Sequence, residues 1–312
     1  MRITVLGSIN HDIVSKAKRL PAVGETVEGL GVEWIPGGKG ANQAVQAALL
    51  GAQTWFVGCV GEDESGSVLE ASLKSRGVHT DYLYKMKEAQ SGICSIFVDQ
   101  GGRNMLVHSA GANMRVTGDH IEAAAQTIAG SDFLVMQNEI NMDAVEYGLG
   151  LARKKGVKSI LNPAPALPLK NELFAMIDFI TPNETECEVY TGISRDGRTL
   201  EDWARASAEW FLDRGVGGVC ITLGEEGAYY YDGREEALVG AFRIDALDTT
   251  AAGDCFNAGF AVGLAGGGKV TDTLRLANAC GAVCAMRMGA QPSIGTKEEI
   301  AGFLKEKGIE DE

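Results

Sequence analysis

The sequence feature that most constrains the fold is an alternation of short apolar segments with helical segments, which runs from about residue 110 toward the C-terminus. This alternation is typical of a mostly parallel sheet with helices on both faces. Buried strands predicted at 3–6 and 54–60, with a helix at 41–50 between them, continue the pattern near the N-terminus. We therefore expect an α/β fold with a doubly wound, mostly parallel sheet. The other predicted strands lie at 133–137, 159–162, 179–181 and 218–222, and the helices beside them at 120–128, 142–155, 184–190 and 200–213.

Two strand-like stretches, 27–35 and 82–107, interrupt this alternation because they contain no helix. In the second stretch, the segments SGICSIFVDQ and RNMLVHSA flank a turn predicted at 100–102 and indicate a β-hairpin. Strands inserted at two places in an α/β chain could pair into a small separate sheet that forms a lid. They could equally extend one edge of the main sheet, and their spacing alone favours neither arrangement.

The last part of the chain is predicted to be helical, with helices at 252–264, 271–286 and 297–307. The third begins at Thr296 and has Glu299 three residues later, which is the pattern of a capping box. No low-complexity linker or internal repeat divides the sequence. We therefore expect a single domain over residues 1–312.

The charge balance excludes several classes of partner. The chain has 28 basic and 42 acidic residues, a net charge of −14, which disfavours binding to nucleic-acid phosphates or to an anionic membrane. The longest charge-free stretch, 40–61, contains four glycines, Asn42 and several glutamines, so it is not a membrane span.

Seven scattered cysteines without a CxxC pair predict buried thiols in a reducing compartment. With no secretory leader before Asp12, we expect a cytoplasmic protein.

Most standard catalytic motifs are absent, including GxxxxGK[ST], GxGxxG, GxSxG and HExxH. The four histidines are too dispersed to indicate a triad or a zinc site. The segment PGGKGAN at 36–42 opens a predicted helix, and its glycines allow a ligand to approach the free N–H groups there. We favour a ligand-binding loop over a plain tight turn.

The segment DTTAAGD at 248–254 precedes an apolar helix. Small residues at a helix start leave unpaired amides that can hold an anion. Asp254 falls in the first turn, which we expect to be exposed, where it could orient an attacking hydroxyl during phosphoryl transfer. The alternative is that Asp254 only complements the helix dipole.

Two other segments follow predicted strands. Residues 222–227 could carry a nucleotide at a carboxyl edge, although a turn into a strand at 228–231 explains them as well. Asn183 and Glu186, three residues apart at a helix start, suit a water-rich Mg²⁺ shell. A simple Asn183 cap with Glu186 at the third helical position explains that pair better on local grounds.

Taken together, these segments resemble the PfkB-type carbohydrate kinases over nearly the whole chain. LNPAPA and TPNETE are most similar to the members that phosphorylate ribose. Eight ordered matches at compatible spacing are far more specific than any one of them. They are GSINHD at 7–12, GGKGANQAV at 37–45, GAN at 111–113, LNPAPA at 161–166, TPNETE at 181–186, ITLG at 221–224, DTTAAGDCFN at 248–257 and GAQPS at 289–293.

The resemblance implies a role for each matching position. Asp254 would be the catalytic base, beside an anion hole made by the amides of Ala251, Ala252 and Gly253. The implied sugar contacts are Asn10, Asp12, Gly38, Lys39, Asn42, Glu139 and Asp254 itself. The implied ATP contacts are Asn183, Thr222, Leu223, Gly224, Glu225, Glu226, Gly227, Gly253, Asp254 and Asn278, with Glu186 acting on Mg²⁺ through water. An activating K⁺ would lie among Asp248, Thr250, Cys284, Arg287, Gly289 and Ser293.

The activity that the resemblance implies is ATP-dependent phosphorylation of the 5-hydroxyl of D-ribose. The alternatives are another sugar or nucleoside kinase of the family, acting on deoxyribose, fructose or adenosine, and a non-catalytic sugar or nucleotide sensor. The family's lid favours the separate-sheet arrangement, with insertions at about 11–36 and 82–108, and dimerisation through the lids. His11, Cys284 and Met288 depart from the common pattern, which bears on specificity and cation affinity.

Overall fold

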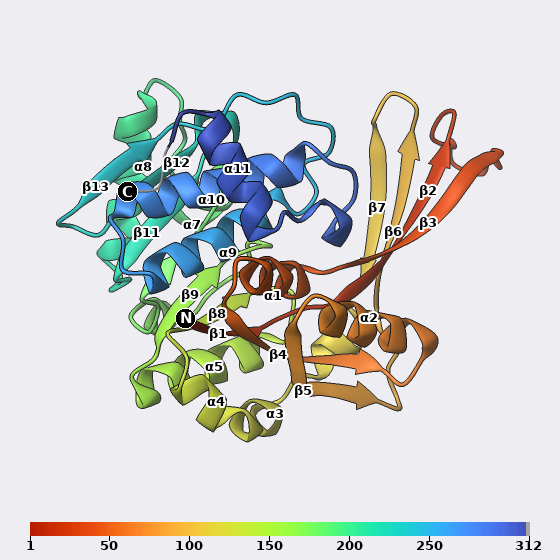
Figure 1. The fold of residues 1–312 in the computed structure, drawn as a ribbon, viewed down its shortest axis with the longest axis horizontal. Coiled ribbons are helices and arrows are strands. Elements are labelled where there is room, and N and C mark those ends of the chain that lie inside the picture. The colour runs from red at the N-terminus through yellow and green to blue at the C-terminus, as the bar shows by residue number, and fades with distance from the viewer. Residues whose placement is uncertain (310–312) are drawn as a thin grey trace.

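The computed structural model describes residues 1–309, and its body is built on a nine-stranded sheet (Figure 1). The strand order is β13-β12-β11-β10-β9-β8-β1-β4-β5, and every pairing from β11 to β5 is parallel. Only the β11–β12 and β12–β13 pairs are antiparallel. The predicted doubly wound, mostly parallel sheet is therefore confirmed. The strands are β1 (Arg2–Leu6), β4 (Gln53–Gly61), β5 (Val78–Met86), β8 (Phe133–Gln137), β9 (Lys158–Asn162), β10 (Phe179–Ile180), β11 (Gly218–Thr222), β12 (Ala228–Tyr231) and β13 (Glu236–Val239).

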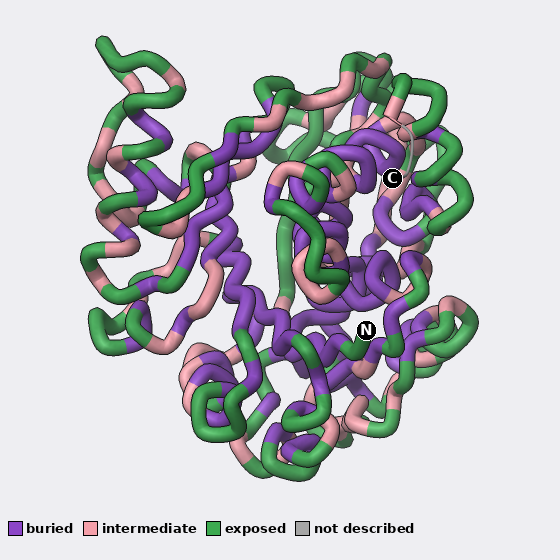
Figure 2. Tube along the Cα trace, turned by 60° about the vertical axis from the view of Figure 1, so that its left-hand side comes forward, coloured by how far each residue is buried: buried purple, intermediate pink, exposed green. Residues whose placement is uncertain are grey.

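Two hydrophobic cores form because successive strand side chains point to opposite faces of this sheet. Val5 packs into the core that also contains buried residues of α1, α9 and α10, whereas Leu6 packs into the core of α5 and α8. Buried positions therefore run through the interior of the body (Figure 2). The first group of helices is α1 (Lys39–Leu49), α2 (Glu64–Ser75), α9 (Ala252–Ala265), α10 (Val270–Ala285) and α11 (Lys297–Glu306). The second is α3 (Gly118–Ala123), α4 (Ala125–Ala129), α5 (Met142–Lys155), α6 (Asn171–Phe174), α7 (Glu184–Thr191) and α8 (Leu200–Leu212).

A separate four-stranded sheet projects from one side of the body, in the order β3-β2-β6-β7 (Figure 1). Its strands are β2 (Asn10–Ala17), β3 (Gly29–Gly37), β6 (Gly92–Asp99) and β7 (Asn104–Ser109). The separate-sheet alternative and the hairpin with its turn at 100–102 are thus confirmed.

One boundary of that insertion is wrong. Residues 82–86, which we placed with the small sheet, belong to β5 at the edge of the main sheet. The half-buried Tyr82 and Tyr84 of β5 pack against the α3–α5 core, and this burial explains the pairing with β4.

Helix ends follow their local capping signals. The capping box of Thr296 and Glu299 is present at the start of α11, as predicted. The helix predicted at 120–128 is instead two helices, α3 and α4, because a tight turn from the N–H of Ala124 to the carbonyl of Ile121 ends the first. Within residues 1–309, no helix has the length and apolar character needed to cross a membrane. Residues 310–312 of the expected domain lie outside the described residues.

Candidate active site

The site lies where the chain leaves β1 and where α1 and α9 begin. Close backbone contact requires glycine at the start of α1: a Cβ on Gly38 would lie 2.7 Å from Cα of Ile9, and one on Gly40 would lie 2.7 Å from Cα of Gly7. Gly38 also has φ of +92°, a backbone conformation that residues with a side chain rarely adopt. These two glycines therefore allow the start of α1 to lie directly against the end of β1, and this packing places Lys39 and Asn42 beside α9.

Asp254 sits in the first turn of α9, and the expectation that its side chain is exposed there is wrong. The residue is only 7% exposed because α1 covers it. Its Oδ2 accepts a hydrogen bond from Nδ2 of Asn42 at 2.9 Å, and its Oδ1 accepts one from Nε2 of Gln43 at 3.1 Å. Burial raises the pKa of Asp254, while the charge of Lys39 and these two amides oppose that rise. A buried carboxylate held in this way can act as a proton acceptor.

The segment before Asp254 has an unusual backbone. Ala251, the N-cap of α9, has φ of +64° and is the only non-glycine residue with positive φ in residues 1–309. The N–H of Ala252 donates to the carbonyl of Thr249 at 3.1 Å. Within the described residues, the N–H groups of Ala251 and Gly253 have no hydrogen-bond partner. Left-handed strain with free amides is typical of an anion-binding turn.

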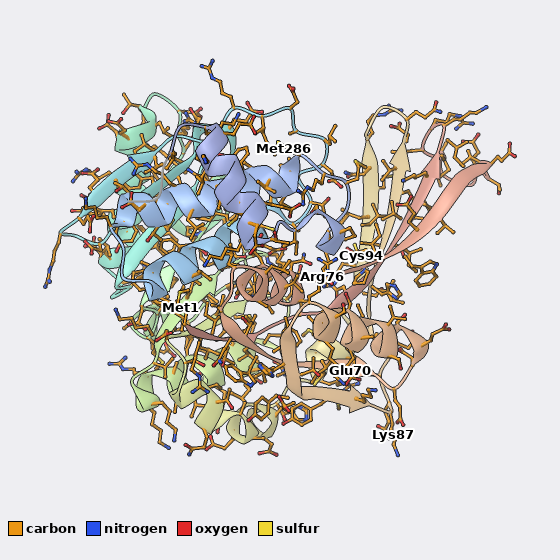
Figure 3. All side chains as sticks on the ribbon, in the orientation of Figure 1. Met1, Glu70, Arg76, Lys87, Cys94 and Met286 are labelled. Carbon is orange, nitrogen blue, oxygen red and sulfur yellow. The ribbon has the colours of Figure 1, made fainter. Side chains whose placement is uncertain are left out.

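Polar side chains of β2 lie on the face of the small sheet that carries the expected sugar contacts. Asp12 is 8% exposed and is the cross-strand neighbour of Cys94, which in turn pairs with His108. Figure 3 shows Cys94 at the base of this sheet. Burial, together with the charges of Glu139 and Asp254, raises the pKa of Asp12 to about 7.

Asn10 is fixed by contacts with two other side chains. Its Oδ1 accepts a hydrogen bond from Nδ2 of Asn113 at 2.7 Å, and its Nδ2 lies 3.2 Å from Nε2 of His108. Asn113 also pairs with the backbone N–H and carbonyl of Ile9. The GAN segment at 111–113 therefore orients Asn10, a role that its matching sequence alone did not indicate.

Lys39 and Glu139 bring opposite charges to the same place. Lys39 Nζ lies 3.9 Å from Oε1 of Glu139, whose Oε2 accepts a hydrogen bond from Oγ of Ser8 at 2.7 Å. Burial lowers the pKa of Lys39, but the carboxylates of Asp254 and Glu139 outweigh it and hold the pKa above its usual value. Asp12, Lys39, Glu139 and Asp254 thus interact electrostatically as one group.

The two expected nucleotide segments meet at the carboxyl ends of β10 and β11, where Asn183 and Thr222 form an isolated parallel bridge. Asn183 and Glu186 form a full capping box, as the local reading of that pair predicted. Residues 223–227 form a tight turn that leads into β12. Asn278, on α10, donates to the carbonyls of Val239 and Gly240 at the end of β13.

The expected cation residues also gather in one place. Asp248 accepts hydrogen bonds from Thr250 and from the N–H of Gly289. Cys284 Sγ lies 3.4 Å from the carbonyl of Thr250 and 3.0 Å from Oγ of Ser293. The Arg287 side chain instead pairs with Glu299. Across residues 1–309, no cluster of three His, Cys, Asp or Glu side chains suits a metal ion.

Sequence reasoning missed a set of buried amides around Asp254. Gln43 contacts Asp254 directly, and Gln137 and Asn162 contact Gln43. All three are at most 7% exposed. The available signal was a glutamine within a predicted helix of mostly small and apolar residues, since Ala41, Ala44 and Val45 lie around Gln43 in the sequence.

The chain is similar to known carbohydrate kinases over nearly its whole length. Residues 1–297 match the model of the pfkB family carbohydrate kinases. The chain therefore belongs to the pfkB family. A ribokinase of Haemophilus influenzae is 38% identical, with 97% of this chain and 98% of that protein covered. A deoxyribokinase of Salmonella typhi is 34% identical, with 97% and 99% covered. The structure of Arabidopsis thaliana ribokinase complexed with ribose and ATP aligns with a TM-score of 0.90, at 31% identity over 97% of this chain and 98% of that chain.

Proposed function

We propose that this chain is an ATP-dependent kinase that transfers a phosphoryl group to the 5-hydroxyl of D-ribose and produces D-ribose 5-phosphate. Membership of the pfkB family supports the kinase activity. The ribokinase relative, similar over nearly its full length, and the neighbour solved with ribose and ATP support the substrates. The observation that carries the proposal is the buried Asp254, which lies beside the free amides of Ala251 and Gly253.

In this reaction Asp254 accepts the proton of the attacking hydroxyl as the bond to phosphorus forms. The amides of Ala251 and Gly253, with Ala252 between them, face the charge that develops on the transferred group. Lys39 adds a positive charge at the same place. Asn10, Asp12, Gly38, Asn42 and Glu139 hold the sugar hydroxyls. Closure of the small sheet as a lid excludes water, which otherwise competes as the acceptor.

For the nucleotide, we propose that Asn183, residues 222–227 and Asn278 contact ATP, whose phosphates carry Mg²⁺. Glu186 fits a contact with the ion through water. Its Oε2 accepts from the N–H of Asn183, and its Oε1 has no hydrogen-bond partner within residues 1–309. Mg²⁺, when bound, neutralises phosphate charge.

We also propose a K⁺ site among Asp248, Thr250, Cys284, Arg287, Gly289 and Ser293. The side chains of Asp248, Cys284 and Ser293 converge there, and they fix the loop that leads to Ala251. Carbonyl and hydroxyl oxygens are the usual ligands of such an ion. The Arg287 side chain points to Glu299, so only its backbone carbonyl is available to the ion.

A homodimer through the lids fits the outer face of the small sheet. Val32 and Phe97 both pair with Ser15, and Phe97 also pairs with Met105, so these side chains form one row across the four strands. Val32, Phe97 and Met105 are each at least 42% exposed. Because side chains alternate along a strand, this row faces away from Asp12. A Phe97→Glu variant is expected to sediment as a monomer in analytical ultracentrifugation.

We also propose that the enzyme lies in the cytoplasm, because all seven cysteines, each within the described residues, are free thiols.

The test is a substrate panel with ATP and Mg²⁺ that compares D-ribose, 2-deoxyribose, fructose and adenosine. The deoxyribokinase relative makes 2-deoxyribose the second candidate. D-ribose is expected to have the highest kcat/KM, and Asp254→Asn is expected to lower kcat by about 10²–10⁴-fold. Preference for another acceptor would contradict the ribose assignment, and more than a tenth of wild-type kcat in Asp254→Asn would remove Asp254 from its role.

A further inference from the structure

Gln43 occupies the centre of the buried amides that surround Asp254. The residue is 1% exposed, and its Nε2 donates both to Oδ1 of Asp254 at 3.1 Å and to Oδ1 of Asn162 at 3.3 Å. Its Oε1 accepts from Nε2 of Gln137 at 2.7 Å. Asn42, the preceding residue on α1, holds the other oxygen of the carboxylate. Two consecutive residues of one helix therefore fix both oxygens of Asp254.

A carboxylate accepts hydrogen bonds only, so it dictates the orientation of each amide beyond it. Gln43 must turn its NH₂ toward Asp254, and its oxygen must then face the NH₂ of Gln137. Asn162 in turn accepts from Gln43 with its oxygen and donates with its Nδ2 to the carbonyl of Thr181 at 3.1 Å. The whole set of donors is thus arranged for an ionised Asp254.

The same chain of hydrogen bonds returns to α9. The hydroxyl of Thr181 contacts Oδ1 of Asn257, and Nδ2 of Asn257 donates to the carbonyl of Gly253 at 2.8 Å. Gly253 directly precedes Asp254, so the bonds close a ring through Gln43 and Asn162. A movement of Gln43 would therefore displace both the carboxylate and the turn that carries the free amides.

We propose that Gln43 is a positioning residue for phosphoryl transfer. It holds the carboxylate of Asp254 in a fixed position relative to the anion-binding turn. The inference rests on the proposed function, in which Asp254 is the base. Packing alone does not require this arrangement. Gln46, on the same helix and 0% exposed, donates from Nε2 only to the carbonyl of Gly295, and its buried Oε1 has no partner within residues 1–309. Gln46 therefore provides a matched control for the loss of a buried glutamine.

The test is a double-mutant cycle on kcat with Gln43→Met and Asp254→Asn, measured in steady state, with single-turnover rates to show that the change is in phosphoryl transfer. Loss of a hydrogen bond to a charged group corresponds to about 10- to 100-fold in rate. Gln43→Met is expected to lower kcat by that factor in the wild-type background, and by less than about threefold in the Asp254→Asn background. The KM for ribose is expected to stay within about threefold of wild type, because the side-chain hydrogen bonds of Gln43 go to Asp254, Asn162 and Gln137 and not to Asn10, Asp12 or Glu139.

Two further variants keep the result interpretable. Gln46→Met is expected to lower the free energy of unfolding as Gln43→Met does, but to leave kcat within about threefold of wild type. Gln43→Glu keeps the shape of the side chain and places a second carboxyl against Asp254, so it should lower kcat at least as far as Gln43→Met.

An equal loss of kcat from Gln43→Met in both backgrounds would overturn the positioning role, and so would an unchanged kcat in Gln43→Glu. Failure of the proposed function would show differently. It would appear as an active Asp254→Asn variant, whatever the substitution at Gln43.

Discussion

The raised pKa of Asp12 has a measurable effect on folding stability. Its pKa moves from 3.8 to about 7 in the folded chain, mainly through burial and then through Glu139 and Asp254. Below pH 3.8 the carboxyl is protonated in both states, so it has no effect. Between the two values only the unfolded state loses the proton, so stability falls as pH rises, and above pH 7 the full loss remains. A difference of about three pKa units corresponds to roughly 4 kcal/mol.

Asp12→Asn removes this pH dependence, because the amide does not ionise. We expect the variant to gain stability relative to wild type as pH rises, by about 2–3 kcal/mol more at pH 8 than at pH 5. Urea denaturation of both proteins at the two pH values measures this difference, and titrating groups that do not interact with Asp12 cancel in the comparison. Asp81→Asn, at an exposed position of β5, serves as the control and should change by no more than about 0.5 kcal/mol at either pH. A stability difference between Asp12→Asn and wild type that is the same at pH 5 and pH 8 would refute the reasoning.

Three further predictions concern the cation, the sugar and the backbone. Replacing Na⁺ with K⁺ at fixed ionic strength should raise the reaction rate, and identical rates in choline, Na⁺ and K⁺ would exclude the cation site. D-ribose should exceed 2-deoxyribose by at least about tenfold in kcat/KM, since an unpaired buried group costs about 1–3 kcal/mol, and Asp12→Ala should narrow that gap. Gly40→Ala should lower the free energy of unfolding in urea by about 1–3 kcal/mol, because its Cβ would lie 2.7 Å from Gly7. Gly150→Ala, where a Cβ meets nothing within 4 Å in the middle of α5, should instead raise it by about 0.5–1 kcal/mol.

The main sheet was predictable because its strands are short apolar runs separated by amphipathic helices. This alternation of strand and helix is compatible with few fold classes other than a parallel sheet covered by helices. The small sheet was harder to assign. The residues at 78–86 and at 92–99 are both strand-like, and only tertiary packing decides that the first joins β4 and the second joins β2. No local property of either segment distinguishes an edge strand of one sheet from a central strand of another.

The candidate site, too, was predictable from the sequence only in part. The sequence singled out Asp254 and the GGKGAN segment as chemically unusual, but it gave no sign that α1 covers the side chain of Asp254 at the start of α9. The hydrogen bond between Asn42 and Asp254 spans 212 positions in the chain. That contact changes the chemistry, because a carboxylate at an exposed helix start is hydrated and needs no partners, whereas a buried one must be held by donors. The requirement for donors is what gives Gln43 a function, and it follows from the fold rather than from the motif in which Gln43 stands.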